Sequence, residues 1–220
     1  MTEPTGGSTD RPRRPVVVPA IALVAATALG ITALLGGLSE ATEEPDPLGQ
    51  GAVLDQGLYS TKFVESRVKV EPPENDWDEE KRFVELVFDV TNQADDTFSV
   101  GAPPVRPEQA HLATSFAGSL IKISPAFDKE AGPFAYALSK GGETGQLFPG
   151  VTSQVVVRYE LKNGQQPPEK ITMDVAAFEF APDFNNNLPR WTMVTKEVGD
   201  KFAPEVKARV TLPVKEGDPA

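Results

Sequence analysis

Beyond residue 52, apolar residues recur along this chain with a period of two, and this pattern restricts the fold more than any other feature. The segment 83–91 places four of them on one face, namely Val84, Leu86, Phe88 and Val90. Successive side chains of a strand point to opposite faces, so the pattern is typical of strands with one buried face. No segment beyond residue 52 shows the period of an amphipathic helix. The sequence therefore predicts an all-β fold for this region.

The pattern predicts about eight strands separated by turn residues. Strand-like segments occur at 64–70, 83–91, 97–100, 120–123, 134–138, 155–161, 171–175, 191–195 and 206–214. The clearest expected hairpin joins 83–91 to 97–100 through the polar turn residues 92–96. Short strands of this kind favour two packed antiparallel sheets, an immunoglobulin-like β-sandwich, with a closed barrel as the alternative.

A second constraint is the uncharged stretch from Val16 to Leu38. As a helix it is roughly 34 Å long, enough to cross a hydrocarbon core of about 30 Å. Arginines precede the stretch and acidic residues follow it, an asymmetry that places the N-terminus in the cytoplasm. The sequence thus predicts a single transmembrane helix that holds the rest of the chain outside the cytoplasm. The alternative is a signal peptide cleaved near 39–41, which would give a secreted protein.

The remaining segments complete the predicted organisation. Polar and acidic composition predicts disorder at both ends and in a stalk, because these residues bury too little apolar area. The parts are a cytoplasmic tail 1–15, the transmembrane helix 16–38, a flexible acidic stalk 39–52, an extracytoplasmic β-sandwich domain 53–215 and a disordered tail 216–220. Within the domain, the Pro-rich region 103–142 is an elaborated crossing with a helical turn near 108–112, and long loops often carry function.

Composition excludes several classes of function. The formal net charge of −11 disfavours nucleic acid as a partner. The chain has no cysteine and a single histidine, His111, which removes thiol chemistry, disulfides and multi-histidine metal sites. His111 with Ser115 could form a base and nucleophile pair, but a solvated histidine is the favoured interpretation. We expect no enzymatic activity and no cofactor, and we interpret the Gly-rich segment 140–145 as a hairpin connection.

Two segments contain the candidate binding residues. The loop 71–80 carries six carboxylates, which could hold calcium, although a solvated hairpin loop is the favoured interpretation. We expect Trp77 within this loop to fold back onto the sandwich, with contact to a partner as the alternative. The stretch 178–191 is rich in aromatic residues, which we expect mainly to fill the core, with an exposed patch for a protein partner as the alternative. The candidate partner contacts are Trp77, Phe184 and Trp191.

Two stretches, RFVELVFDVTNQADDTFSV at 82–100 and GQLFPGVTSQVVVRYEL at 145–161, carry a family resemblance. Together with the N-terminal apolar segment and the acidic stalk, they resemble exported immunoglobulin-like domains of unknown function in Gram-positive bacteria, which are related to the mycobacterial immunoprotective extracellular antigen. In that family an apolar strand ends in Asn before a polar turn, and a later Pro-Gly turn introduces a long strand. Here 90–92 and 149–150 occupy those places. Family members are usually anchored through a lipidated cysteine, so this chain would be anchored by its helix instead.

The resemblance implies an envelope binding or accessory domain. Our leading hypothesis is a non-catalytic, membrane-anchored extracytoplasmic binding domain whose partner is an unknown envelope or membrane protein. The alternative is an accessory subunit of a membrane transporter or secretion complex. Small residues such as Gly30, Gly36 and Gly37 would then let the predicted helix pack closely against other helices.

Overall fold

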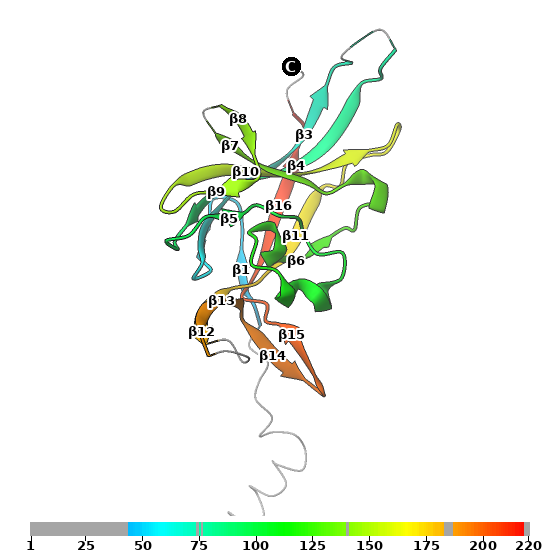
Figure 1. The fold of residues 1–220 in the computed structure, drawn as a ribbon. Coiled ribbons are helices and arrows are strands. Elements are labelled where there is room, and N and C mark those ends of the chain that lie inside the picture. Colours follow the sequence, from blue (N-terminus) through cyan, green and yellow to red (C-terminus); the bar gives the residue numbers. More distant parts are fainter. Residues whose placement is uncertain (1–43, 74, 76, 140, 183–186, 218–220) are drawn as a thin grey trace, which may run out of the picture. The chain divides into compact units, whose positions relative to one another are not determined.

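The computed structural model describes residues 44–73, 75, 77–139, 141–182 and 187–217, which form mostly β-strands (Figure 1). The all-β prediction is therefore confirmed for this part of the chain. It also contains three short 3-10 helices, η1 (Pro107–Leu112), η2 (Ala117–Ser119) and η3 (Lys129–Ala131). Among these residues no helix is both long and apolar enough to cross a membrane. The predicted transmembrane segment 16–38 lies outside the described residues.

The strands form one large sheet and three two-stranded ribbons. Along the large sheet the order is β6 (Leu120–Ser124), β11 (Lys170–Val175), β16 (Ala208–Lys215), β3 (Tyr59–Glu71), β4 (Lys81–Asn92), β10 (Thr152–Leu161), β7 (Phe134–Ser139) and β8 (Gly142–Thr144). Strand β1 (Asp46–Leu48) lies beside β16, and β2 (Val53–Asp55) lies beside β3. The ribbons are β12 (Phe178–Pro182) with β13 (Pro189–Met193), β14 (Thr195–Val198) with β15 (Lys201–Pro204), and β5 (Phe98–Ser99) with β9 (Gln146–Leu147).

Strand β16 joins the two halves of the large sheet. Most of it pairs antiparallel with β11, but its last two residues, Val214 and Lys215, pair in parallel with Ser66 and Arg67 of β3. The two halves are therefore continuous through this strand, whereas the sequence predicted two separate antiparallel sheets. The pairing of β16 with β3 is parallel, and the alternation of side chains along a strand does not indicate whether its neighbour runs parallel or antiparallel.

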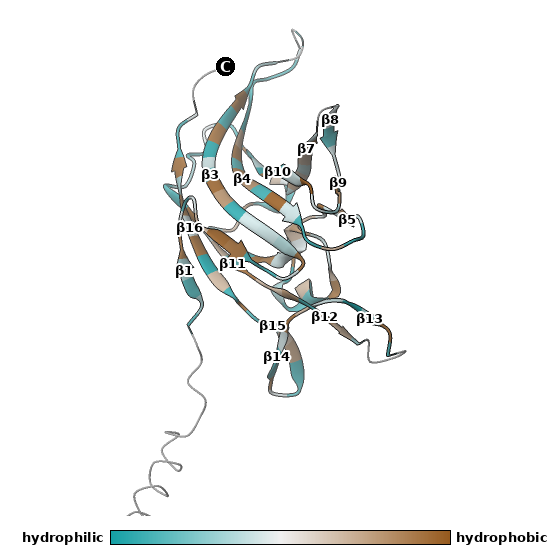
Figure 2. Cartoon of the chain, turned by 90° about the vertical axis from the view of Figure 1, so that its left-hand side faces the viewer, coloured by the Kyte–Doolittle hydropathy of each residue, from teal (hydrophilic) through white to brown (hydrophobic). Residues whose placement is uncertain are grey.

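The core lies between these two halves, because both contribute to one buried apolar cluster. It includes Phe63 and Phe88 from β3 and β4, and Met173 and Leu212 from β11 and β16. Figure 2 shows the underlying alternation of apolar and polar residues along the strands. At one end of the core, the Tyr59 ring makes edge contacts with several aromatic rings, and such pairs each contribute about 0.5–1.5 kcal/mol beyond area burial.

The expected hairpin between 83–91 and 97–100 is wrong. Strand β4 pairs with β3 and β10, while β5 pairs with β9. The buried Asn92 side chain explains the change of direction, because its Nδ2 donates to the carbonyls of Asp96 at 2.7 Å and Leu147 at 3.0 Å. These bonds hold the turn residues against the segment before β10, so the chain leaves the sheet instead of folding back along β4.

One predicted boundary also needs correction. We expect the flexible stalk to reach residue 52, but the compact unit begins at Pro45, and Asp46–Leu48 pairs in parallel with β16. Leu48 packs against the core, which offsets the cost of ordering this segment. The described residues of the aromatic stretch 178–191 lie mainly in the β12–β13 hairpin. The predicted helical turn near 108–112 is confirmed by η1, whereas the segment 140–145, which we interpret as a hairpin connection, contains the second strand of a hairpin, β8, paired with β7.

Candidate functional site

The loop that joins β3 to β4 presents Trp77 to solvent. Trp77 is 95% exposed, so the expectation that it folds back onto the sandwich is wrong. The two strands stay paired as far as Glu71 and Lys81, which carries the loop away from the core. Asn75 then shapes the loop, because its Oδ1 accepts from Trp77 N at 3.0 Å and its carbonyl accepts from Asp78 N at 3.1 Å. Figures 1 and 2 show this hairpin at the end of the domain opposite β14 and β15.

A shallow hollow of about 390 Å³ lies beside Trp77, between the β3–β4 loop and the end of β10. Its lining is Trp77, Asp78, Glu79, Glu80, Lys81, Glu160, Leu161, Lys162 and Asn163, so carboxylates outnumber basic groups. Asn163 Nδ2 donates to Glu79 Oε2 at 2.9 Å, which links the β10–β11 turn to the loop. An exposed tryptophan in a negatively charged hollow suits a partner surface that carries basic groups.

The two lysines of this hollow are already paired with carboxylates. Lys162 Nζ lies 3.0 Å from Asp128 Oδ2 and 3.8 Å from Glu130 Oε2, and the hydrogen bond with Asp128 raises the pKa of Lys162. Lys81 Nζ lies 3.8 Å from Asp78 Oδ1. Lys162 thus remains protonated at neutral pH, and both lysines lie close to carboxylates, while Glu79 and Glu80 are exposed to solvent.

The calcium hypothesis for 71–80 gains no support from the described residues. Among them no group of three or more Asp, Glu, His or Cys side chains is placed to hold a metal ion. Two carboxylates of the loop, Glu74 and Asp76, lie outside the described residues.

A second hollow, of about 360 Å³, lies under the Pro-rich crossing. The floor includes Tyr159, whose ring stacks on Phe127 with 4.2 Å between ring centres. Burial raises the pKa of Tyr159 above its ordinary value, so its hydroxyl stays neutral at physiological pH. The wall includes Pro103, Pro104 and Pro107. This hollow can receive a small apolar group, and it comes from the region 103–142 that the sequence singled out.

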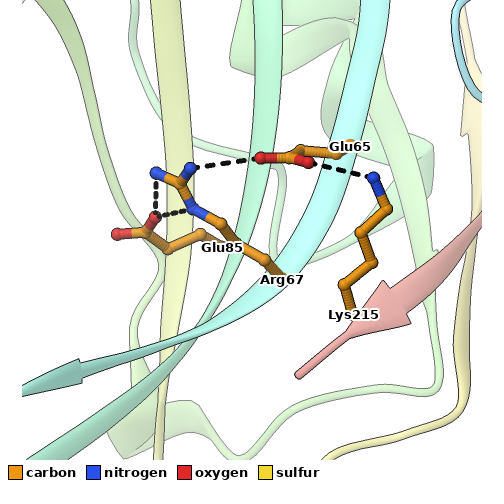
Figure 3. Close-up of polar contacts among 4 residues, drawn as sticks. All are labelled: Glu65, Arg67, Glu85 and Lys215. Carbon is orange, nitrogen blue, oxygen red and sulfur yellow. Dashed lines mark hydrogen bonds and ion pairs between the residues drawn. The ribbon is translucent and has the colours of Figure 1, made fainter. Parts of the chain in front are cut away.

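An ion-pair network lies on the face of the large sheet turned away from the core (Figure 3). The Arg67 guanidinium contacts Glu85 Oε2 at 3.0 Å and Glu65 Oε1 at 3.1 Å, and Glu65 Oε2 contacts Lys215 Nζ at 3.2 Å. The network links β3, β4 and β16, and its charges pair with one another. Its geometry therefore indicates a structural role. Period-two alternation places these side chains on the face opposite the apolar residues, but only the strand register, which the sequence does not show, brings Arg67 opposite Glu85.

The other predicted site residues do not join Trp77. Trp191 is half-buried in β13, and the centre of its ring lies 5.4 Å from the centre of the Phe180 ring. Strand β13 lies at the opposite end of the domain from the β3–β4 loop (Figure 1). The prediction that this stretch fills the core holds for Phe178, whereas Phe180 is exposed. Phe184 lies outside the described residues. His111 Nδ1 is buried in η1 with no hydrogen-bond partner, so this atom makes no pair with Ser115.

No protein-family model, curated protein or solved structure matches this chain.

Proposed function

We propose that this protein is a membrane-anchored, extracytoplasmic binding domain of the bacterial cell envelope, and that it does not catalyse a reaction. In this proposal residues 16–38 cross the membrane with the N-terminus in the cytoplasm, and an immunoglobulin-like sandwich binds an envelope or membrane protein. The arginines before the apolar stretch and the carboxylates after it support this orientation. A single core shared by both halves of the large sheet supports the sandwich.

The exposed indole of Trp77 is the observation that carries the binding function. Tryptophan buries a large apolar area, and it is enriched among the few interface residues that dominate binding energy. Here it extends from a loop anchored by two long strands, beside the exposed carboxylates Glu79 and Glu80. The partner would cover the indole with an apolar pocket and place lysine or arginine side chains near these carboxylates. Such charges would mainly raise the association rate and select the partner.

Site-specific photocrosslinking tests this function. A photoreactive aromatic amino acid is introduced at Asp78 in the full chain, in the cells that produce it, so that Trp77 stays in place. We expect an ultraviolet-dependent adduct of one defined mass. Trp77→Ala, or the pair Glu79→Lys and Glu80→Lys, should reduce the yield of this adduct at least about tenfold, because the loss of an anchor residue weakens an interface by that much or more.

The matched control is Trp191→Phe, which changes the only other tryptophan of the chain. This variant should leave the adduct unchanged, because β13 lies at the other end of the domain. An adduct that persists undiminished in Trp77→Ala would contradict the proposed site.

A further inference from the structure

Exposed apolar side chains gather on the two hairpins β12–β13 and β14–β15. Phe202 is 66% exposed and Phe180 is 59% exposed, and Val198 beside the β14–β15 turn is also mostly exposed. Phe202 and Val198 lie on opposite faces of their hairpin, because Glu197 pairs with Phe202 and Val198 pairs with Lys201. Each face of the hairpin tip therefore carries one large apolar side chain, with the exposed Glu197 beside Phe202 and the exposed Lys201 beside Val198.

These hairpins lie at the end of the domain where the described chain begins. Asp46, the first residue of β1, pairs with Ala208, and its N–H donates to the Lys207 carbonyl at 3.4 Å. Both of these residues follow closely after β15. Figures 1 and 2 show β14 and β15 extending away from the large sheet at the end of the domain where β1 begins.

The covalent connection to the predicted transmembrane helix is short. Even fully extended, the residues from Leu38 to Asp46 span at most about 28 Å, because one residue adds about 3.5 Å. If Leu38 ends the membrane segment, the start of β1 is held within that distance of the lipid surface. The two hairpins then lie at the tethered end of the domain.

Residues 178–207 contain Glu179, Asp183, Glu197, Asp200 and Glu205 against Arg190, Lys196, Lys201 and Lys207, a net charge of −1, which for a segment of this length is close to the average of the chain at −11 over 220 residues. Charge therefore does not set this end of the domain apart from the rest. Lys196 and Lys201 are exposed beside the hairpin tip, where their ammonium groups can reach lipid phosphates while their stems lie along the acyl chains.

We propose that the β12–β13 and β14–β15 hairpins dock onto the lipid surface and place Phe180, Val198 and Phe202 in the boundary between headgroups and acyl chains. This inference rests on the proposed membrane anchor, and it is independent of the proposed partner site at Trp77. Docking at this end points the β3–β4 loop away from the membrane. Aromatic rings favour this boundary, and a covalent tether raises the local concentration of the hairpins at the surface.

Spin labelling of the full chain in vesicles of phosphatidylcholine with phosphatidylglycerol tests this docking. The chain has no cysteine, so Val198→Cys gives a single labelled site that leaves both phenylalanines in place. We expect the label at 198 to be several-fold more accessible to oxygen, which concentrates in lipid, than to a water-soluble nickel chelate. The matched control, Asp78→Cys at the opposite end, should show the reverse preference. Adding Phe180→Ser and Phe202→Ser to Val198→Cys should return the label at 198 to water.

The outcomes separate this inference from the proposed function. If the chain floats with the vesicles but the label at 198 is as accessible to the nickel chelate as the label at 78, the docking proposal is overturned and the anchor stands. If the full chain does not float with the vesicles, the anchor and the docking proposal both fail. Protection of position 198 from both reagents, together with crosslinked dimers, would assign the surface to a second copy of the chain and would also overturn lipid docking.

Discussion

The guanidinium carbon of Arg158 lies 4.4 Å from the centre of the Phe83 ring, on the outer face of the large sheet. From the same position Arg158 Nη1 donates to Glu71 Oε1 at 2.6 Å, and the Tyr136 ring centre lies 5.5 Å away. One side chain thus connects β10 to β4, β3 and β7. This arrangement explains why a charged residue is stable in the middle of a sheet, with only 20% of its side chain exposed.

Arg158→Lys should lower the free energy of unfolding by about 1–2 kcal/mol, because an ammonium group cannot stack over Phe83 and reach Glu71 with the same fixed geometry. Urea unfolding followed by circular dichroism measures this change. Lys162→Met, at an exposed ion pair, is the control and should leave the free energy of unfolding almost unchanged. Equal effects of the two substitutions would contradict the structural role given to Arg158.

Gln56→Leu should destabilise the domain by about 2–4 kcal/mol, because it leaves buried polar groups without partners. The fully buried Gln56 side chain accepts from Thr61 Oγ1 at 2.6 Å and donates to Ser119 Oγ at 2.9 Å and to the Ala176 carbonyl at 2.7 Å. The same unfolding measurement applies. Gln93→Leu removes an exposed bond to Asp55 and should have an effect below about 1 kcal/mol, so similar losses for both variants would count against the buried network.

Gly57→Ala and Gly51→Ala separate backbone strain from steric conflict. Both glycines have positive φ, +80° and +82°, so each alanine should cost about 1–2 kcal/mol from strain alone. A Cβ on Gly57 would also collide with the Phe178 carbonyl, whereas a Cβ on Gly51 meets no atom within 4 Å. We expect a clearly larger loss of stability, and a lower Tm, for Gly57→Ala. Matching losses would show that the β2–β3 turn adjusts freely around Phe178.

Tyr59→Phe should make the domain less sensitive to alkaline pH. Burial raises the pKa of Tyr59 above its ordinary value of 10.0. Above pH 10 the unfolded chain releases this proton while the folded chain retains it, so the stability present at lower pH is progressively lost. The measurement is the free energy of unfolding from pH 8 to 12. Above pH 10 the free energy of unfolding of the wild type should fall more steeply than that of the variant, by up to about 1.4 kcal/mol for each pH unit.

Below pH 10 the variant should be about 1 kcal/mol less stable than the wild type, because it lacks the hydrogen bond from the Tyr59 hydroxyl to the Thr114 carbonyl at 2.7 Å. Parallel pH profiles for the two proteins would show that Tyr59 titrates normally in the folded state.

Period-two alternation was enough to predict most of the sheet. It placed Val84 and Leu86 of β4 on the buried face, and the structure confirms both, although Glu85 and Val87 on the opposite face of β4 are buried as well. Alternation reports which face is buried, but it does not report which strand lies alongside. The expected hairpin after β4 failed for this reason, since one acceptor of the Asn92 side chain, the Leu147 carbonyl, is distant in sequence.

The candidate site was harder to predict than the fold. The sequence singled out Trp77, but it favoured the wrong position, because an isolated indole in an acidic loop gives no sign of how far the paired strands extend. The exposed Phe202 had no signal at all: in the sequence it lies in a segment that resembles the rest of the strand-forming region. Its exposure depends on the β14–β15 ribbon lying outside the large sheet.

Cysteine accessibility in intact cells tests the central claim, a domain held outside the cytoplasm, most directly. Because the chain has no cysteine, Asp78→Cys and Thr5→Cys each provide one reactive site, in the folded domain and in the N-terminal tail. With a membrane-impermeant maleimide we predict labelling of position 78 in intact cells, and labelling of position 5 only after the membrane is permeabilised. Labelling of position 5 in intact cells while position 78 stays protected would contradict the orientation, and with it the proposed function.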